Sequence, residues 1–312
     1  MTPKRSITRR LFCGGLAAAA VLPATAQIAM AETQPQRQMQ TGSLEVPGAR
    51  LYYETHGRGP LLIMVPGAAG SGDPFRMVAG HLAAHYTVVL YDRRGFSRSR
   101  PAGPQDRDRR LKTEADDVRR LIEHVGDGPA TVFGTSSGGI IALELLARHP
   151  SVVRTLVASE PAAVRQLPDG QKWVDFFTEV YDLYRRSGVE TALQTFRERA
   201  FAESDRRTMA RAPKTEFTRP NATYWFEHEL RQYPAVELDL AALKAHADRI
   251  VLMSGRDSRG YPAYQVNVEL GRKLGRNVIE MPGGHVGFLS QPAEFAREFV
   301  QALARIGHGP KR

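Results

Sequence analysis

Hydrophobic and polar positions follow two alternating patterns from residue 51 to the end of the chain. Short apolar runs rich in β-branched side chains predict buried strands, and longer segments with one apolar face predict helices. The predicted strands cover residues 51–54, 61–65, 87–91, 130–133, 153–158, 249–253 and 277–281. The predicted helices cover residues 74–84, 112–124, 139–148 and 292–305. This alternation predicts an α/β fold, with a mostly parallel central sheet and helices on both faces.

One long stretch interrupts this alternation. Residues 161–243 show no clear strand pattern but several helical ones, with aromatic side chains concentrated in 172–186 and 221–233. Because a segment of this length is too long for a connection, we interpret it as a helical lid inserted after the sixth strand. The lid is expected over the carboxyl edge of the sheet, where open α/β sheets bind ligands. Most of its aromatic side chains are expected to form the lid's own core.

The lid divides the predicted core into two segments. The α/β core is predicted to comprise residues 42–160 and 244–312, and a polar tether is predicted at 32–41.

The first 31 residues have the layout of a targeting segment. A basic start is followed by an apolar run at 11–22, which is too short to span a bilayer because spanning needs about 20 apolar residues. Small-residue cleavage sites end at Ala26 and at Ala31, and both remain open. This order predicts a signal peptide at 1–31.

The basic start also suggests a route. Arg9 and Arg10 are adjacent and precede apolar residues, so the segment resembles a twin-arginine export signal. The resemblance implies the twin-arginine export machinery as a partner and a periplasmic or extracellular destination. No stable membrane anchor is expected after cleavage.

Composition narrows the function classes. The chain is 42% hydrophobic and 24% charged, which is typical of globular proteins and excludes a disordered class. The net charge of +10 falls to +6 without residues 1–31, and no basic run with interleaved aromatics indicates nucleic-acid binding. The single cysteine, Cys13, lies in the predicted leader. A mature chain would therefore lack disulfides, cysteine-ligated metals and a cysteine nucleophile.

A G-x-S-x-G motif carries the first candidate chemistry. Gly134, Ser136 and Gly138 lie between a predicted strand and a predicted helix. A serine on such a sharp turn projects from the sheet edge, and small neighbours let the turn pass close to the flanking chain. We therefore predict Ser136 as a catalytic nucleophile; the competing interpretation is a glycine-rich turn with an idle serine.

A nucleophilic serine needs a base and an acid that orients the base. His285 lies on a glycine-rich loop after the last predicted strand, where it could reach over the sheet edge. Asp257 follows the penultimate strand and is the predicted acid, although aspartate also favours turns and helix caps. Glu160, at the end of strand 153–158, is the alternative acid.

The predicted oxyanion hole combines two backbone N–H groups. Ser137 follows the nucleophile, and Ala68 lies in the small-residue loop after strand 61–65. No metal and no cofactor is expected.

Together the motifs resemble those of the α/β-hydrolase family, from about residue 44 to the last helix. Besides the serine turn, residues 91–99 resemble the family's D-x-R-G-x-G-x-S turn, and residues 283–285 with 292–295 match the family's histidine region. The order Ser136, Asp257, His285 is that expected of the family. One departure is Pro66-Gly67, where the family often has His-Gly, which affects a hydrogen bond behind the oxyanion hole.

The resemblance implies a cofactor-free enzyme with a lidded pocket for a small-molecule substrate. We expect a serine hydrolase acting on an ester or lactone through an acyl-enzyme. Alternatives on the same fold are a carbon–carbon bond hydrolase and a cofactor-free perhydrolase of the haloperoxidase type. Epoxide hydrolases and haloalkane dehalogenases carry aspartate at the serine turn, so Ser136 argues against both. A secreted ligand-binding protein on a hydrolase scaffold is the non-enzymatic alternative.

Overall fold

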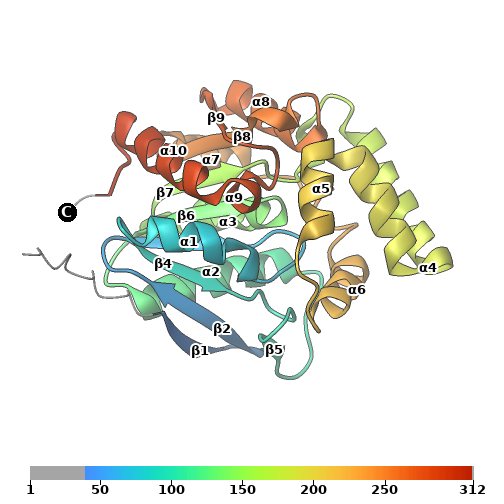
Figure 1. Cartoon of the computed structure of the whole chain (residues 1–312), viewed down its shortest axis with the longest axis horizontal. Coiled ribbons are helices and arrows are strands. Elements are labelled where there is room, and N and C mark those ends of the chain that lie inside the picture. The colour runs from blue at the N-terminus through green and yellow to red at the C-terminus, as the bar shows by residue number, and fades with distance from the viewer. Residues whose placement is uncertain (1–38, 311–312) are drawn as a thin grey trace, which may run out of the picture. The chain divides into compact units, whose positions relative to one another are not determined.

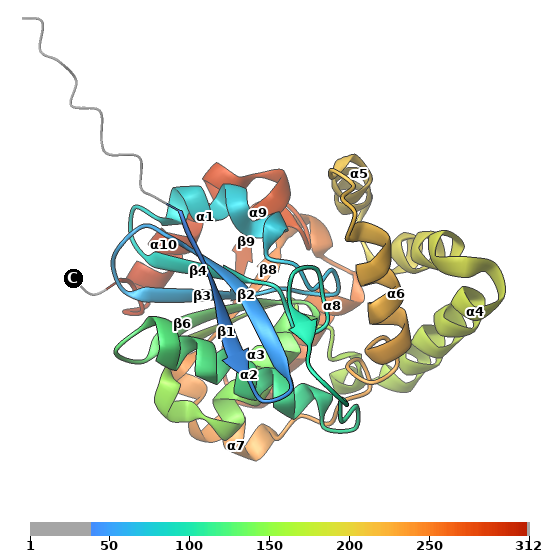
Figure 2. The same ribbon diagram turned by 90° about the horizontal axis from the view of Figure 1, so that it is seen from below.

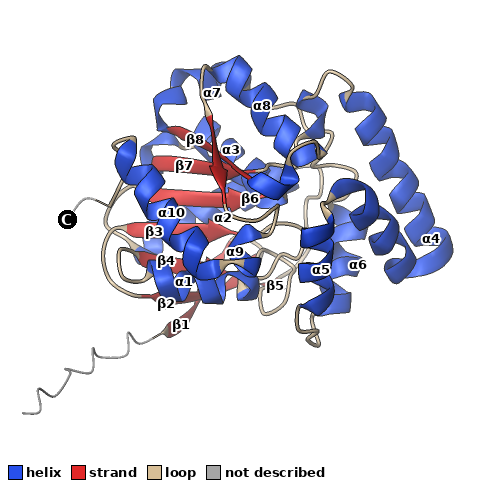
Figure 3. Ribbon diagram, turned by 45° about the horizontal axis from the view of Figure 1, so that its top comes forward, coloured by secondary structure: helices blue, strands red, loops and turns tan. Residues whose placement is uncertain are grey.

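A nine-stranded sheet runs through residues 39–310, the part of the chain that the computed structural model describes (Figures 1 and 3). Its order is β1-β2-β4-β3-β6-β7-β8-β9, with β5 paired to β2. The strands are β1 (Gln40–Val46), β2 (Ala49–His56), β3 (Leu61–Val65), β4 (Thr87–Tyr91), β5 (Arg100–Pro101), β6 (Ala130–Thr135), β7 (Val153–Ser159), β8 (Ile250–Gly255) and β9 (Val278–Met281).

The six neighbouring strands β4, β3, β6, β7, β8 and β9 are parallel. The strands β1, β2 and β5 pair in antiparallel fashion. All five residues of β3 are buried, as expected for a parallel strand covered on both faces. Leu62 and Met64 face one apolar core, and Ile63 and Val65 face the other, because successive side chains point to opposite faces.

Helices cover both faces of the sheet (Figure 2). Helices α1, α9 and α10 lie on one face, and α2, α3, α7 and α8 on the other. In α10, Phe295, Phe299 and Leu303 repeat every four residues and are buried, which explains why this segment docks as a helix. These helices are α1 (Arg76–Leu82), α2 (Arg110–Val125), α3 (Ser137–Arg148), α7 (Leu240–Ala245), α8 (Pro262–Leu274), α9 (Gly287–Ser290) and α10 (Pro292–Arg305).

Three further helices lie beyond one end of the sheet (Figure 1). They are α4 (Gly170–Ala200), α5 (Glu203–Arg211) and α6 (Thr218–His228). We call residues 161–239, which contain these helices, the helical insertion. It follows β7, the sixth strand when the two-residue β5 is not counted. Its aromatic side chains pack on one another and join the same apolar core as α2 and α3, so it is not a separate apolar unit.

The predicted α/β architecture is confirmed, with differences at the edges. Gln40 and Thr41, predicted to belong to the tether, pair with β2, and helices α5 and α8 were not predicted. The predicted leader, 1–31, lies outside the described residues. Within residues 39–310, no helix is long and apolar enough to cross a membrane.

Candidate active site

Ser136 occupies a strained turn between β6 and α3. Its φ of 55° and ψ of −123° lie where L-residues are rarely found, at a cost of about 1–3 kcal/mol that the surrounding structure must offset. A Cβ on Gly134 would lie 2.3 Å from the carbonyl oxygen of Gly138, and one on Gly138 would lie 2.2 Å from that of Val65. Both glycines of the motif are therefore required by close backbone contacts.

Glu160 lies beside Ser136 because their strands are neighbours. Thr135 pairs with Ser159 across β6 and β7, so the residue that follows each strand falls at the same sheet edge. Glu160 is 1% exposed and has a φ of 45°. Its Oε1 accepts a 2.8 Å hydrogen bond from the Gly255 N–H, which fixes the carboxylate.

His285 completes this group from the loop after β9. Its Nδ1 lies 2.7 Å from Oε2 of Glu160, and its side chain is 6% exposed. Burial lowers the pKa of His285, but the hydrogen bond to Glu160 and the charges of Glu160 and Asp205 outweigh burial and raise it. The pair therefore holds the ring in one orientation and favours its protonated form.

Asp257, the predicted acid, does not contact the imidazole. It lies in the short turn Arg256–Ser258 after β8, where its side chain is exposed and its N–H donates to the Gly283 carbonyl oxygen. The reason is backbone packing: a Cβ on Gly255 would lie 2.3 Å from the carbonyl oxygen of Gly284. The loop that bears His285 thus lies directly against the end of β8. The His285 ring reaches past β8 to Glu160, the alternative acid.

The loop predicted to supply Ala68 lies against the serine. A Cβ on Gly67 would be 3.0 Å from Cβ and 3.7 Å from Oγ of Ser136. The Gly67 carbonyl oxygen accepts from Nη1 of Arg93 and from the Gly70 N–H, each at 2.9 Å. Because C=O and N–H point in opposite directions across a trans peptide, the Ala68 N–H is turned away from Arg93.

Arg93 is central to a buried ionic cluster. Its side chain is inaccessible to solvent and pairs with Glu114 of α2 at 2.7 Å and with Glu229 of the helical insertion at 2.5 Å. Arg110 pairs with Glu114 at 2.5 Å. This cluster joins the predicted D-x-R-G turn, the loop beside Ser136 and the insertion.

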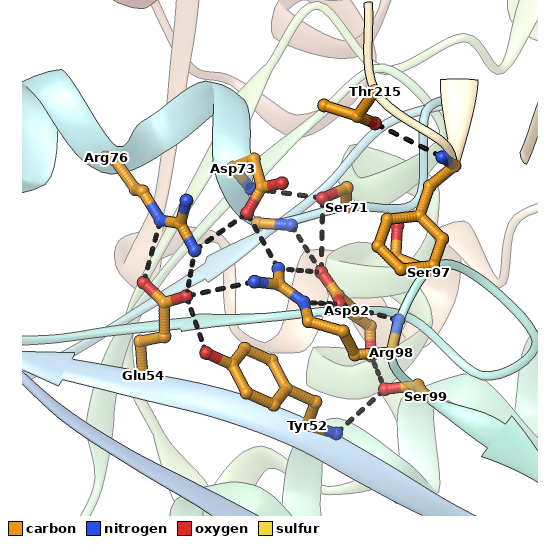
Figure 4. A network of polar contacts seen from close by, with 12 residues as sticks. Tyr52, Glu54, Ser71, Asp73, Arg76, Asp92, Ser97, Arg98, Ser99 and Thr215 are labelled. Atoms are coloured by element: carbon orange, nitrogen blue, oxygen red, sulfur yellow. Dashed lines mark hydrogen bonds and ion pairs between the residues drawn. The ribbon is translucent and has the colours of Figure 1, made fainter.

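A second polar network holds the same turn from its other side (Figure 4). Asp92 accepts from Nε of Arg98 at 2.5 Å and from the Gly72 N–H at 3.0 Å. Arg98 also pairs with Asp73 at 2.7 Å and with Glu54 at 3.2 Å. The loops after β3 and β4 are thereby tied together, which restrains the backbone next to Ser136.

The helical insertion contributes contacts that the sequence patterns did not reveal. Asn221 of α6 accepts from the Ser97 N–H at 2.9 Å and donates to the Ala69 carbonyl oxygen at 3.0 Å. Asp205 of α5 accepts the N–H groups of His285 and Val286, each at 3.0 Å. Asp205 is an acid in the first turn of a helix, a common position that gives no sign of a long-range contact.

Among residues 39–310, no group of three or more histidine, cysteine, aspartate or glutamate side chains is arranged to hold a metal ion. The polar groups that the fold gathers at this sheet edge are Ser136, the His285–Glu160 pair and nearby backbone N–H groups.

The chain is similar to several known proteins. The profile of the alpha/beta hydrolase fold family matches residues 60–292. The uncharacterized hydrolase YraK of Bacillus subtilis is 35% identical over 269 residues, covering 85% of this chain and 96% of YraK. Two solved structures are 18% identical. A thermophilic esterase from Thermogutta terrifontis has a TM-score of 0.68 over 86% of this chain and 99% of its own. An enol-lactonase from Burkholderia xenovorans has a TM-score of 0.64, and the alignment covers 84% of this chain and 100% of the lactonase chain.

Proposed function

Because the chain belongs to the α/β hydrolase fold family, we propose that it is a serine hydrolase that cleaves an ester or lactone through an acyl-enzyme. One observation carries the proposal: Ser136 lies on a strained turn at the sheet edge where Glu160 and His285 form a buried hydrogen-bonded pair. An idle serine would not require this backbone conformation.

In the proposed mechanism, His285 accepts the Ser136 hydroxyl proton while Oγ attacks the substrate carbonyl carbon. The Glu160 carboxylate stabilises the imidazolium that forms. The N–H groups of Ser137 and Ala68 donate to the developing oxyanion; the N–H at the start of α3 has no partner within the helix. His285 then gives the proton to the leaving alcohol, and a water activated by the same histidine hydrolyses the acyl-enzyme.

The contacts of Gly67 support Ala68 as the second oxyanion donor. Its peptide is fixed because Arg93 and the Gly70 N–H both bind the Gly67 carbonyl oxygen. A donor that is already oriented needs no reorganisation during the reaction, which is the source of oxyanion stabilisation.

An ester or lactone fits this machinery because both present a carbonyl carbon with an alkoxide leaving group. The same fold is found in an esterase and in an enol-lactonase.

The test is intact-mass analysis after treatment with a fluorophosphonate probe, which phosphonylates activated serines. We expect one adduct on the wild type and none on Ser136→Ala, with thermal stability little changed. An adduct that persists on Ser136→Ala would reject Ser136 as the nucleophile. No adduct on either protein would favour the ligand-binding alternative.

We further propose that residues 1–31 direct export by the twin-arginine route. In cell fractionation, replacement of Arg9 and Arg10 by lysine should retain the protein in the cytoplasm, whereas the wild type should appear outside it. Equal export of both proteins would reject the route.

A further inference from the structure

We infer that Asp205, in the helical insertion, is a positioning residue for His285. Its carboxylate holds the backbone of the histidine loop and places a second negative charge beside the imidazole. This inference rests on the proposed function, because it assigns Asp205 a part in the action of the same base.

The contact is specific in its geometry. Oδ2 of Asp205 accepts the N–H of His285, and Oδ1 accepts the N–H of Val286, each at 3.0 Å. Each oxygen thus takes one of two consecutive N–H groups, a pattern that an ionised carboxylate satisfies and a neutral amide satisfies only in part. Asp205 is 2% exposed, so water does not compete for these bonds.

The histidine loop is shaped to receive this carboxylate. A Cβ on Gly284 would lie 2.3 Å from Oδ2 of Asp205, so any side chain there would displace the carboxylate. Phe201, four residues before Asp205, packs its ring against the imidazole with centroids 4.7 Å apart. The insertion therefore contacts His285 through both its backbone and its ring.

The charges also point to His285. The pKa of Asp205 is raised: burial raises it most and the Glu160 charge raises it further, while the two N–H bonds and the His285 charge lower it only in part. Among the elements against α5, α9 carries no ionisable side chain, and the end of α4 carries Arg197, Glu198 and Arg199. The Asp205 charge acts on His285 together with that of Glu160, in the direction that stabilises the imidazolium.

Through these contacts the helical insertion also positions the loop that bears His285. Docking of α5 supplies two of the hydrogen bonds that fix the loop bearing the base. An insertion that moved away would take the carboxylate acceptor from the His285 and Val286 N–H groups and would remove one charge from beside the imidazole.

The test is an NMR titration of the His285 imidazole in wild type, Asp205→Asn and Glu203→Gln, with the resonance assigned from His285→Gln. Glu203→Gln is the matched control, because it removes one negative charge from the same helix at an exposed position. We expect the His285 pKa to fall in Asp205→Asn and to stay unchanged in Glu203→Gln. At a pH above the His285 pKa of both proteins, where the imidazole is neutral in each, the rate of Ser136 phosphonylation should fall about tenfold to a hundredfold in Asp205→Asn, as expected for a displaced base.

A purely structural role would lower stability without moving the pKa, so an unchanged His285 pKa in Asp205→Asn would overturn the inference. The titration needs no turnover and separates the two proposals. An unreactive wild-type Ser136 with a shifted His285 pKa rejects only the hydrolase, and a reactive Ser136 with an unshifted pKa rejects only the positioning role.

A measurement on the wild type covers the case in which Asp205→Asn fails to fold. We expect the amide hydrogens of His285 and Val286 to be strongly protected from exchange, since both bond to a buried carboxylate. Exchange at the rate of an open loop would contradict the inference.

Discussion

Glu160 and His285 are separated by 125 positions in the sequence, yet Oε2 of Glu160 lies 2.7 Å from Nδ1 of His285. The contact spans β8, which lies between the strands that precede the two residues. The other carboxylate oxygen of Glu160, Oε1, accepts a hydrogen bond from the N–H of Gly255 in β8. Glu160 is therefore anchored by the strand that it reaches across.

This relationship predicts which acid matters. Glu160→Gln should lower kcat by about 10³–10⁴-fold, because the imidazolium loses its counter-charge and the ring its preferred tautomer. Asp257→Asn is the control and should leave kcat little changed, since its side chain is exposed. Steady-state kinetics on a cleaved ester would decide, and the reverse pattern would return the acid to Asp257.

The raised pKa of His285 predicts the pH dependence. A protonated imidazole cannot accept the Ser136 proton, so the rate of phosphonylation should rise with pH, with a midpoint above the ordinary histidine value of about 6.5. A midpoint below that value would contradict the contact with Glu160.

The same shift has a consequence for stability with a fixed sign. A raised folded-state pKa stabilises the protein fully below about pH 6.5, and this contribution is lost as pH rises through the folded-state pKa. The unfolding free energy lost in His285→Gln should therefore be larger at acidic pH than at alkaline pH. Urea denaturation at both pH values checks this, and an equal loss at both would count against it.

The buried pair of Arg93 and Glu229 predicts a further effect on stability. Glu229→Gln removes one of the two negative partners of the inaccessible Arg93 guanidinium and leaves Glu114 as the other. The free energy of unfolding should therefore fall by about 2 kcal/mol. Glu237→Gln, which breaks a more exposed pair with Arg165, should cost about 0–1 kcal/mol. Chemical denaturation of both variants provides the comparison, and equal losses would refute the importance of burial.

The close packing of the serine turn gives a steric prediction. In Gly138→Ala, the new Cβ would lie 2.2 Å from the Val65 carbonyl oxygen, so the turn must shift and stability should fall by about 1–3 kcal/mol. Phosphonylation of Ser136 should fall as well. Gly128→Ala, whose Cβ would meet nothing within 4 Å, should behave as the wild type. Full reactivity of Gly138→Ala would show that the turn tolerates the shift.

The sequence predicted the succession of strands and helices along the chain, the serine turn and the histidine loop, because each has a local signature. Strand periodicity located β6, and the glycines around Ser136 and His285 marked the turns that those residues occupy. Local patterns do not distinguish Asp257 from Glu160 as the acid, because both residues follow strand ends.

The distinction depends on tertiary features. Glu160 reaches the imidazole because the histidine loop lies against Gly255, a contact between the ends of two strands. Asp205 and Glu229 act on residues 80 and 136 positions away. Side chains like these occur on any helix or loop, and only the placement of the helical insertion gives them a partner.

With Glu160 as the acid that we propose, the turn after β8 lies outside the chemistry. Asp257 contributes a backbone N–H there, which almost any residue other than proline can provide, and its side chain is exposed. Because Cys13 is the sole cysteine and lies within residues 1–31, Asp257→Cys would create a single thiol in residues 32–312. A fluorophore attached at this corner, beside the histidine loop but not part of the site, would report on the environment of that loop while the reacting groups keep their native form.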